Sequence, residues 1–452
     1  MAIIVPFRGV IYNREKIEEF NKVTAPPYDI ISPEQQEGYY QKSPYNVIRL
    51  ILGKQFLHDS PTDNRYTRAA GVFDIWQEKS ILIRDKKPSL YFYRQEFSVS
   101  GKEKVTRDGF ICLVRLEDKE KRVVIPHEKT LDKPKEDRLQ LMEACHANFS
   151  SIFSLYSDPE DVINQQLKKM ITGSVLLEVT DEDNTRHQLW RISQMGVIKQ
   201  ISQHLRDRSL FIADGHHRYE TALNYRNLQI ERYPQSTGKE AYNYVMMYLT
   251  SMEGEGLVIL PYHRVIRNLE GFDFGNFEKK LEDYFEVKTF QFSEENEMQV
   301  WEEFNKQLQD DTLSRPAFGM YGAGQACYHL LVLKEEVFFS LSGRGEGSKA
   351  LKKLDVNVIE SVIFKDALGI TSKDLQQEQN MTYVHDGLEG LELVRDKGYQ
   401  LAFFLNSTKS SEIRDIASRG ETMPQKSTYF YPKLLSGTVI NKIVPEESIE
   451  FS

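Results

Sequence analysis

Cysteine is scarce in this chain of 452 residues, which contains Cys112, Cys145 and Cys327 and no others. An odd number of widely spaced cysteines without a CxxC pair argues against a disulfide framework and against a cysteine-ligated zinc site. Long hydrophobic runs are also lacking: no stretch of about 18 apolar residues occurs, so we expect no membrane-spanning helix. The opening MAIIVPFRGV has no basic segment before its apolar patch, so we expect no signal peptide and a cytoplasmic location.

Positive charge is in deficit, with 58 Lys and Arg against 67 Asp and Glu and a net charge of −9. Nonspecific nucleic-acid binding needs a positive field, so a nucleic-acid partner is disfavoured. Apolar residues are plentiful at 40%, with 25 Phe and 23 Tyr. A chain of this composition can bury a sizeable core, which excludes wholesale disorder.

Helical and strand patterns alternate along the chain, which predicts an α/β (α+β) fold. Ser32 followed by Pro33 predicts the start of a helix. Apolar spacing predicts helices over 65–79, 134–147, 274–285 and 355–368, and strands over 7–12, 90–97, 151–156, 242–250, 256–266, 315–322 and 326–334. We place soft boundaries near 110 and 270, giving an N-terminal α/β region (1–110), a core (111–269) and a C-terminal α+β region (270–452).

The most informative segment is Asp214-Gly215-His216-His217-Arg218, which lies between an apolar strand and a predicted helix. A helix N-terminus presents backbone N–H groups and the positive end of a dipole, so it attracts anions. Gly215 permits a tight turn, Arg218 offers a fork suited to phosphate oxygens, and the two histidines add donors. Asp214 could bind a cation, accept a proton or serve only as a helix cap. The run of five such residues favours a phosphate-binding loop.

Three further positions are candidates, each with a plainer alternative. Glu128 follows the apolar strand 123–125 and is placed for general-base chemistry, but it could be a solvated turn residue. His263 ends a strand and could be a functional or a structural histidine. Lys426 or Lys433 could contact a phosphate, or could protect an edge strand. Lys135, Arg138 and Asn148, after Glu128, could line the same cleft, but we interpret each of them chiefly as part of a solvated helix face.

These motifs resemble those of a bacterial and archaeal family called domain of unknown function (DUF) 1015, over nearly the whole chain. The matching segments, in order, are FRGVIYN, APPYDIISPE, SPYNVIRLILG, YTRAA, PHEKTL, PKEDRL, ANFSSIFSLYSD, FIADGHHRYETAL and MPQKSTYFYPK. The family name implies no activity.

The central region, about residues 110–265, is also similar to the ParB/sulfiredoxin-like fold, whose members bind a nucleotide with such a loop. His216 stands where sulfiredoxins need a cysteine, and no helix-turn-helix unit like that of partition proteins is evident. The similarity to free-serine kinases implies Glu128 as catalytic base, Asp214 to Arg218 as the nucleotide loop and His263 as a substrate contact.

We therefore predict a kinase that uses ATP or ADP with Mg²⁺ to phosphorylate free L-serine or a similar hydroxy compound. Its predicted catalytic residues are Glu128 and Asp214, and Asp214 would hold the metal or orient the loop. One alternative is a metal-dependent hydrolase using Asp214, His216, His217 and His263, although no HExxH motif occurs. Another is a non-catalytic nucleotide-binding or DNA-associated regulator. The metal ligands, the substrate and the oligomeric state stay open.

Overall fold

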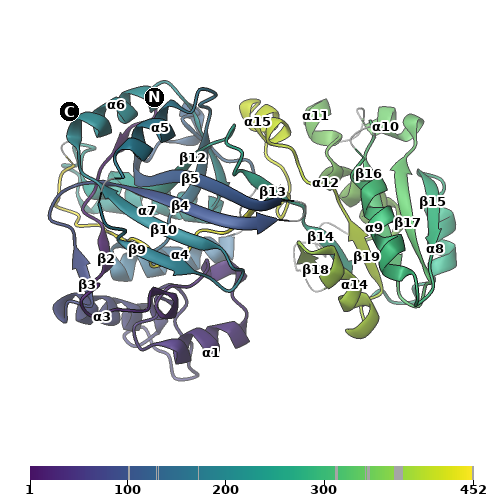
Figure 1. Ribbon diagram of the computed structural model, residues 1–452, viewed down its shortest axis with the longest axis horizontal. Helices are drawn as coiled ribbons and strands as arrows, with labels where there is room; N and C mark the ends of the chain where they lie inside the picture. Colours follow the sequence, from purple (N-terminus) through teal and green to yellow (C-terminus); the bar gives the residue numbers. More distant parts are fainter. Residues whose placement is uncertain are drawn as a thin grey trace. The chain divides into compact units, whose positions relative to one another are not determined.

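The computed structural model describes residues 1–99, 102–128, 130, 132–171, 173–310, 314–341, 343, 347–370 and 380–449. The chain divides into two compact units (Figure 1). The first comprises Met1–Pro126, Thr130–Val258 and Pro432–Ser452, and the second comprises His127–Lys129 and Ile259–Tyr431. The second unit is thus an insertion in the sequence of the first. Strand β5 (Lys102–Arg115) runs through residue 110, where the sequence suggested a boundary.

The first unit is built on a mixed sheet in which β6, β11, β8, β12, β5, β4, β10 and β9 follow in that order and β1 pairs with β5. Its strands are β1 (Ile4–Val5), β4 (Leu90–Val99), β5, β6 (Val124–Ile125), β8 (Ile152–Tyr156), β9 (Leu177–Thr180), β10 (Arg186–Ile192), β11 (Leu210–Asp214) and β12 (Tyr244–Ser251). Two short pairs join β2 (Val10–Tyr12) to β3 (Leu82–Arg84) and β7 (Ala147–Asn148) to β21 (Asn441–Lys442). The long hairpin of β4 and β5 is prominent in Figure 1.

The core of this sheet includes helical side chains from residues 142 to 225. The helices of the first unit surround the sheet. They are α1 (Pro33–Lys42), α2 (Ile48–Ile51), α3 (Arg65–Glu78), α4 (Asp132–Cys145), α5 (Val162–Lys169), α6 (Met195–Leu205) and α7 (His216–Arg232), with 3-10 turns at Phe20–Lys22, Tyr28–Ile30, Lys119–Lys121 and Ala241–Asn243. Helix α7 contacts α4, β8 and β12. Every residue of β12 is buried, which explains why its sequence, YVMMYLTS, lacks a polar face.

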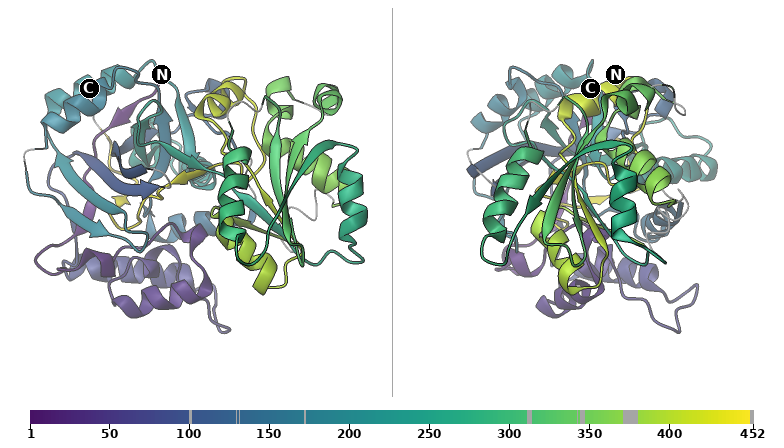
Figure 2. Two further views of the ribbon diagram at one scale, coloured as in Figure 1. Left: turned by 45° about the vertical axis from the view of Figure 1, so that its right-hand side comes forward. Right: turned by 90° about the vertical axis from the view of Figure 1, so that its right-hand side faces the viewer.

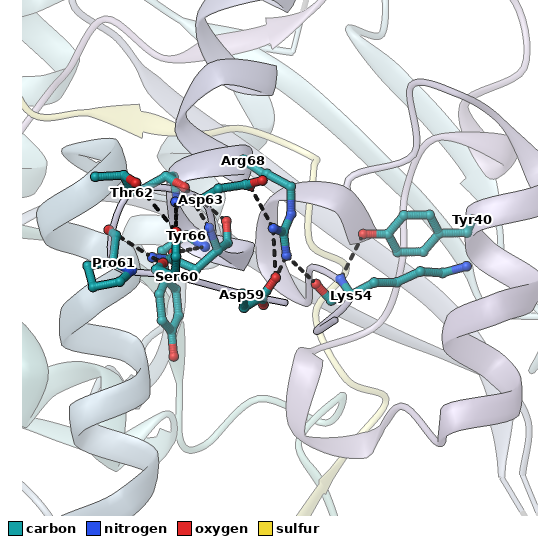
Figure 3. Close-up of polar contacts among 11 residues, drawn as sticks. Tyr40, Lys54, Asp59, Ser60, Pro61, Thr62, Asp63, Tyr66 and Arg68 are labelled. Atoms are coloured by element: carbon teal, nitrogen blue, oxygen red, sulfur yellow. Dashed lines mark hydrogen bonds and ion pairs between the residues drawn. The ribbon is translucent and has the colours of Figure 1, made fainter. Parts of the chain in front are cut away.

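Arg68, near the start of α3, holds the preceding loop against this helix through hydrogen bonds of its guanidinium (Figure 3). Its Nη1 donates to Asp63 at 2.8 Å, and its Nη2 donates to Asp59 at 3.1 Å and to the Lys54 carbonyl at 3.0 Å. The Lys54 amide in turn donates to the Tyr40 hydroxyl at 3.1 Å. Because α3 packs on α4, this anchor fixes a neighbour of the helix that carries Arg138.

The second unit has a sheet in the order β15-β17-β16-β19-β14-β18, with helices on both sides (Figure 2). Its strands are β14 (His263–Ile266), β15 (Phe285–Gln291), β16 (Ala317–Gly322), β17 (Cys327–Leu333), β18 (Met381–Val384) and β19 (Leu401–Phe404), and β13 (Val258–Leu260) pairs with β20 (Tyr429–Tyr431). Its helices are α8 (Phe274–Leu281), α9 (Glu297–Leu308), α10 (Glu335–Leu341), α11 (Lys349–Lys352), α12 (Asp355–Val358), the π-helix η5 (Ile359–Ala367), α14 (Gly387–Asp396) and α15 (Ser410–Ser418).

Strand β19 illustrates why both faces of this sheet are covered. Its neighbouring residues Phe403 and Phe404 point to opposite faces, as the two-residue repeat of a strand requires. Phe404 packs against Trp301 of α9 with ring centroids 4.9 Å apart. Phe403 packs against Phe364 of η5 at 5.8 Å and Phe277 of α8 at 6.5 Å. An apolar strand without alternation is therefore buried on both sides.

The predicted α/β class is confirmed. Ser32 caps α1 in a reciprocal capping box with Gln35, and α3 matches the predicted helix over 65–79. The strand predicted over 256–266 is wrong as a single element, because Pro261 and Tyr262 separate β13 from β14. The helix predicted over 355–368 continues from Val358 as a π-helix. Within the described residues, no helix has both the length and the apolar character needed to cross a bilayer.

Candidate functional site

The loop singled out in the sequence lies where β11 ends at Asp214 and α7 begins at His216. The pairing of β11 with β8 shifts register between Ile212 and Asp214, so an irregularity of the bulge type interrupts the ladder just before the strand ends. Gly215 joins the two elements with φ 94° and ψ 30°. The predicted strand–loop–helix arrangement is confirmed, and a glycine cap has no side chain to occupy the first-turn amides of α7.

Glycine is required at position 215 for two reasons. Its positive φ is disfavoured for residues that carry a Cβ. A Cβ would also come within 2.9 Å of the Cζ, Nε and Nη2 atoms of Arg218. The Arg218 guanidinium therefore lies directly against the backbone of the loop, in space that only glycine leaves open.

Asp214 holds two cations of the first unit. Its Oδ2 accepts a hydrogen bond from Arg218 Nη2 at 2.7 Å, and its Oδ1 accepts one from Lys433 Nζ at 3.1 Å. Arg218 Nη1 also donates to the Ser151 carbonyl at 2.6 Å. Burial acts to raise the pKa of Asp214, but the charges of Lys433 and Arg218 outweigh it and hold this pKa well below its ordinary value.

These contacts bear on the three roles considered for Asp214. Both carboxylate oxygens already bind a cation, and the depressed pKa makes the group a poor proton acceptor at neutral pH. The arrangement therefore favours an orienting role, in which Asp214 fixes Arg218 and Lys433 beside the loop. Lys433 is one of the two lysines considered from the sequence for a phosphate contact or for the protection of an edge strand.

The two histidines occupy the first turn of α7. His216 is buried, with 6% of its surface exposed, and His217 is half-buried. His216 is near enough to Asp214 for its charged form to contribute to the depressed pKa of that carboxyl. Adjacent helical residues point about 100° apart, so the two imidazoles face different surroundings.

Glu128 belongs to the second unit and pairs there with the segment after α15. Its Oε1 accepts hydrogen bonds from the amides of Ser427 and Thr428, each at 3.3 Å, and from the Thr428 hydroxyl at 3.2 Å. Residue 128 also forms a parallel bridge with Met423. Three donors to one oxygen stabilise the ionised carboxylate. From the sequence we interpret Glu128 and the MPQKST segment separately and miss their pairing.

His263 lies in β14 with 8% of its surface exposed. Its Nδ1 accepts a hydrogen bond from the Leu405 amide at 3.1 Å, which places the proton of the neutral ring on Nε2. Burial, together with the charges of Arg264 and His385, lowers the pKa of His263 to about 3. The ring is therefore neutral at physiological pH.

The predicted site residues are thus divided between the units. Asp214, Gly215, Arg218 and Lys433 are together in the first unit, whereas Glu128 and His263 belong to the second. Lys426, the other lysine considered, has φ 55° and its Nζ lies 5.4 Å from the centre of the Tyr262 ring. A common pocket for Glu128 and Arg218 stays a prediction. Over the described residues, no three His, Cys, Asp or Glu side chains are grouped as a metal site.

These observations define the class of the protein. It is an α/β chain in which a loop with a glycine turn joins a buried strand to a helix. The family described as "Protein of unknown function (DUF1015)" matches residues 4–357. This match covers most of the chain, which therefore belongs to that family. No curated protein matches the chain.

Three solved structures are similar to parts of it. A conserved hypothetical protein from Pyrococcus furiosus is 12% identical, with 72% of this chain and 93% of that chain covered and a TM-score of 0.33. A free serine kinase in complex with AMP is 11% identical, with 75% and 93% covered and a TM-score of 0.35. SbnI with a C-terminal truncation, from Staphylococcus aureus, is 11% identical, with 72% and 85% covered and a TM-score of 0.34.

Proposed function

We propose that this protein is a nucleotide-dependent kinase that phosphorylates a small hydroxy compound such as free L-serine. The observation that carries the proposal is the loop after β11, where Gly215 brings Arg218 against the backbone at the start of α7. Helix N-termini and planar guanidinium groups both favour phosphate. In the proposed reaction the nucleotide phosphates bind the loop amides, His216, His217 and Arg218.

Glu128 is the proposed general base, and it would take the proton from the attacking hydroxyl. Its ionised state suits this role, but its Oε1 must exchange at least one of its hydrogen bonds to Ser427 or Thr428 for the substrate. His263 is the proposed substrate contact, through the Nε2–H of its neutral ring. Phosphoryl transfer depends mainly on positioning and electrostatics, which such groups supply.

Kinases commonly use Mg²⁺ to neutralise charge on the phosphates. Asp214 does not fit as its ligand here, because Lys433 and Arg218 occupy its two oxygens. Mg²⁺ usually binds through substrate phosphates and one or two carboxylates, and keeps several waters. No step above therefore depends on a protein-bound metal.

The proposal is tested by incubating the purified full chain with Mg²⁺, L-serine and either ATP or ADP, and measuring phosphoserine. We expect Glu128→Gln to lower the rate by about 10²–10⁴-fold, the range for a general base. The matched control is Glu120→Gln, an exposed glutamate of the Lys119–Lys121 turn, which should keep the wild-type rate. Equal rates for Glu128→Gln and wild type would exclude the proposed base.

A second candidate is a nucleotide-binding regulator without catalysis. It is favoured by the engagement of Glu128, whose Oε1 already accepts three hydrogen bonds. In this case the protein would bind ATP or ADP but release no phosphorylated product with any hydroxy amino acid. Binding of ATP or ADP in a calorimetric titration, together with no phosphorylated product in the assay with hydroxy amino acids, would favour this candidate, whereas binding with product formation would favour the kinase.

A further inference from the structure

Arg218 has a second neighbour besides the loop, a small cavity inside the first unit. The cavity has a volume of about 50 Å³, enough for roughly three to five water molecules. Its lining includes Tyr28, Arg138, Asn148, Arg218 and Thr221, with apolar side chains around them. These residues come from four separate motifs of the sequence, APPYD, PKEDRL, ANFSS and DGHHRYETAL. No acidic side chain is among the described residues that line it.

Arg138 was interpreted from the sequence as part of a solvated helix face, and the structure corrects this. Only 8% of its surface is exposed. Its guanidinium lies over the Tyr28 ring, 3.9 Å from the centroid, and its Nη1 donates to the Ile51 carbonyl at 2.7 Å. Its Nε and Nη2 donate to Asp137. Burial is the main cause that raises the pKa of Tyr28 to about 12, and both Arg138 and Arg218 act on it in the opposite direction.

Both guanidinium groups keep donors for a ligand. Arginine carries five N–H donors. The contacts found in the described part of the chain use three of them on Arg138 and two on Arg218. The side chain of Arg218 is 13% exposed and that of Arg138 is 9% exposed, so water screens neither charge strongly. A buried positive charge is stabilised by an anion that accepts its remaining hydrogen bonds.

The local charges also favour an anion. Asp137 binds both Arg65 and Arg138, and Asp214 binds both Arg218 and Lys433, so each guanidinium group at the cavity shares its carboxylate with another cation. Of the carboxylates that act on Tyr28, Asp29 acts most strongly, and it is exposed to solvent. A phosphate group carries nearly two negative charges at neutral pH and has oxygens enough to accept hydrogen bonds from both guanidinium groups.

We propose that the cavity between Arg138 and Arg218 is a binding site for a phosphate group, with Arg138 as a binding residue that complements the loop. Under the proposed kinase function, on which this last link rests, the bound group is the phosphate of the nucleotide or of the phosphorylated product. The binding site itself requires only a phosphate and no turnover.

The test uses the full chain without nucleotide and inorganic phosphate as the probe. We expect phosphate to bind wild type by calorimetric titration, and Arg138→Gln to weaken this binding roughly tenfold or more, as for the loss of a charge-assisted hydrogen bond. Arg65→Gln is the matched control, because Arg65 also pairs with Asp137 but does not line the cavity. Equal weakening by both variants, or no binding to wild type at millimolar phosphate, would overturn the proposal.

A second measurement needs no variant and stands if Arg138→Gln fails to fold. Hydrogen exchange followed by mass spectrometry reports on the backbone amides around the cavity. We expect phosphate to slow exchange in α4 and in the first turn of α7 and to leave α9, which belongs to the other unit, unchanged. Unchanged exchange in α4 and α7 under saturating phosphate would contradict the site. Equal protection by acetate would contradict the assignment of the site to phosphate.

Further arms with O-phospho-L-serine and with ATP separate the sources of the phosphate. If free phosphate protects the site but no phosphoserine forms, the result supports the anion site and rejects only the kinase proposal. If phosphoserine forms at a rate that Arg138→Gln leaves unchanged and phosphate does not bind, the result rejects only the anion site. The two proposals therefore fail independently.

Discussion

At the scale of single residues, the loop after β11 depends on the carboxylate of Asp214 between Arg218 and Lys433. Asp214→Asn removes the charge that balances two poorly hydrated cations. Breaking a buried ion pair on one side costs about 3 kcal/mol or more of unfolding free energy. Asp415→Asn is a matched control, since Asp415 forms the same i,i+4 pair with Arg419 but in solvent, where such pairs contribute about 0.5 kcal/mol or less. Urea unfolding measures both.

The pH dependence of this difference has a definite sign. The pKa of Asp214 is lowered in the folded state, so its contribution is fully present above the pKa of an unfolded aspartate, about 3.9, and is lost as the pH falls toward the folded value. The stability difference between wild type and Asp214→Asn should therefore be constant from about pH 7 to about pH 5 and shrink below about pH 4. A difference that grows on acidification would contradict this assignment.

The second prediction for a single residue concerns Gly215. Gly215→Ala should lower the unfolding free energy by about 1–2 kcal/mol from the positive φ alone, and more if Arg218 is displaced. Gly71→Ala provides the comparison, because Gly71 is an exposed residue within α3 with no atom within 4 Å of an added Cβ. That change should stabilise the protein by about 0.5–1 kcal/mol. Thermal unfolding of the two variants should move in opposite directions.

At the scale of elements, α1 tests how far a local signal determines a helix start. The Gln35 amide donates to Ser32 Oγ at 3.2 Å, and the Ser32 amide donates to Gln35 Oε1 at 2.9 Å. Ser32→Ala removes one half of this exchange and should cost about 1 kcal/mol. Hydrogen exchange of the first turn of α1 should accelerate. Ser411→Ala, inside the first turn of α15 rather than at its cap, should leave exchange there unchanged or slower.

Elements with local signals were predictable from the sequence. The capping box of α1, the apolar spacing of α3 and the strand–glycine–helix order around Gly215 all act within a few residues. What could not be predicted depends on contacts between distant segments. Lys433 meets Asp214 across 219 positions, and Thr428 meets Glu128 across 300. No periodicity carries that information.

Arg138 shows the same limit in one side chain. A charged residue on a helix is ordinarily solvated, and its sequence neighbours PKEDRL support that interpretation. Its burial arises because Tyr28 covers the guanidinium and Asp137 and the Ile51 carbonyl accept its hydrogen bonds. These partners come together only because the 3-10 turn Tyr28–Ile30, α2 and α4 pack against one another in the first unit.

At the scale of the whole molecule, each unit contains a hydrophobic cluster of its own. The cluster in the first unit includes Phe92 and Met247, and the cluster in the second includes Trp301 and Phe404. Local stability should differ between units, as it does between cooperative folding units in general.

Phe404→Ala tests this division. Phe404 is 1% exposed and contacts the rings of Trp301 and Phe304, so its truncation should cost about 3–5 kcal/mol in the second unit. Hydrogen exchange followed peptide by peptide should accelerate in β14, β16 and β19 and stay unchanged in β5 and β12. Phe92→Ala, a fully buried position of β4, should give the reverse pattern. If either variant accelerates exchange equally in both sheets, the units unfold as one, because the cost of a cavity in one core is then shared by the other.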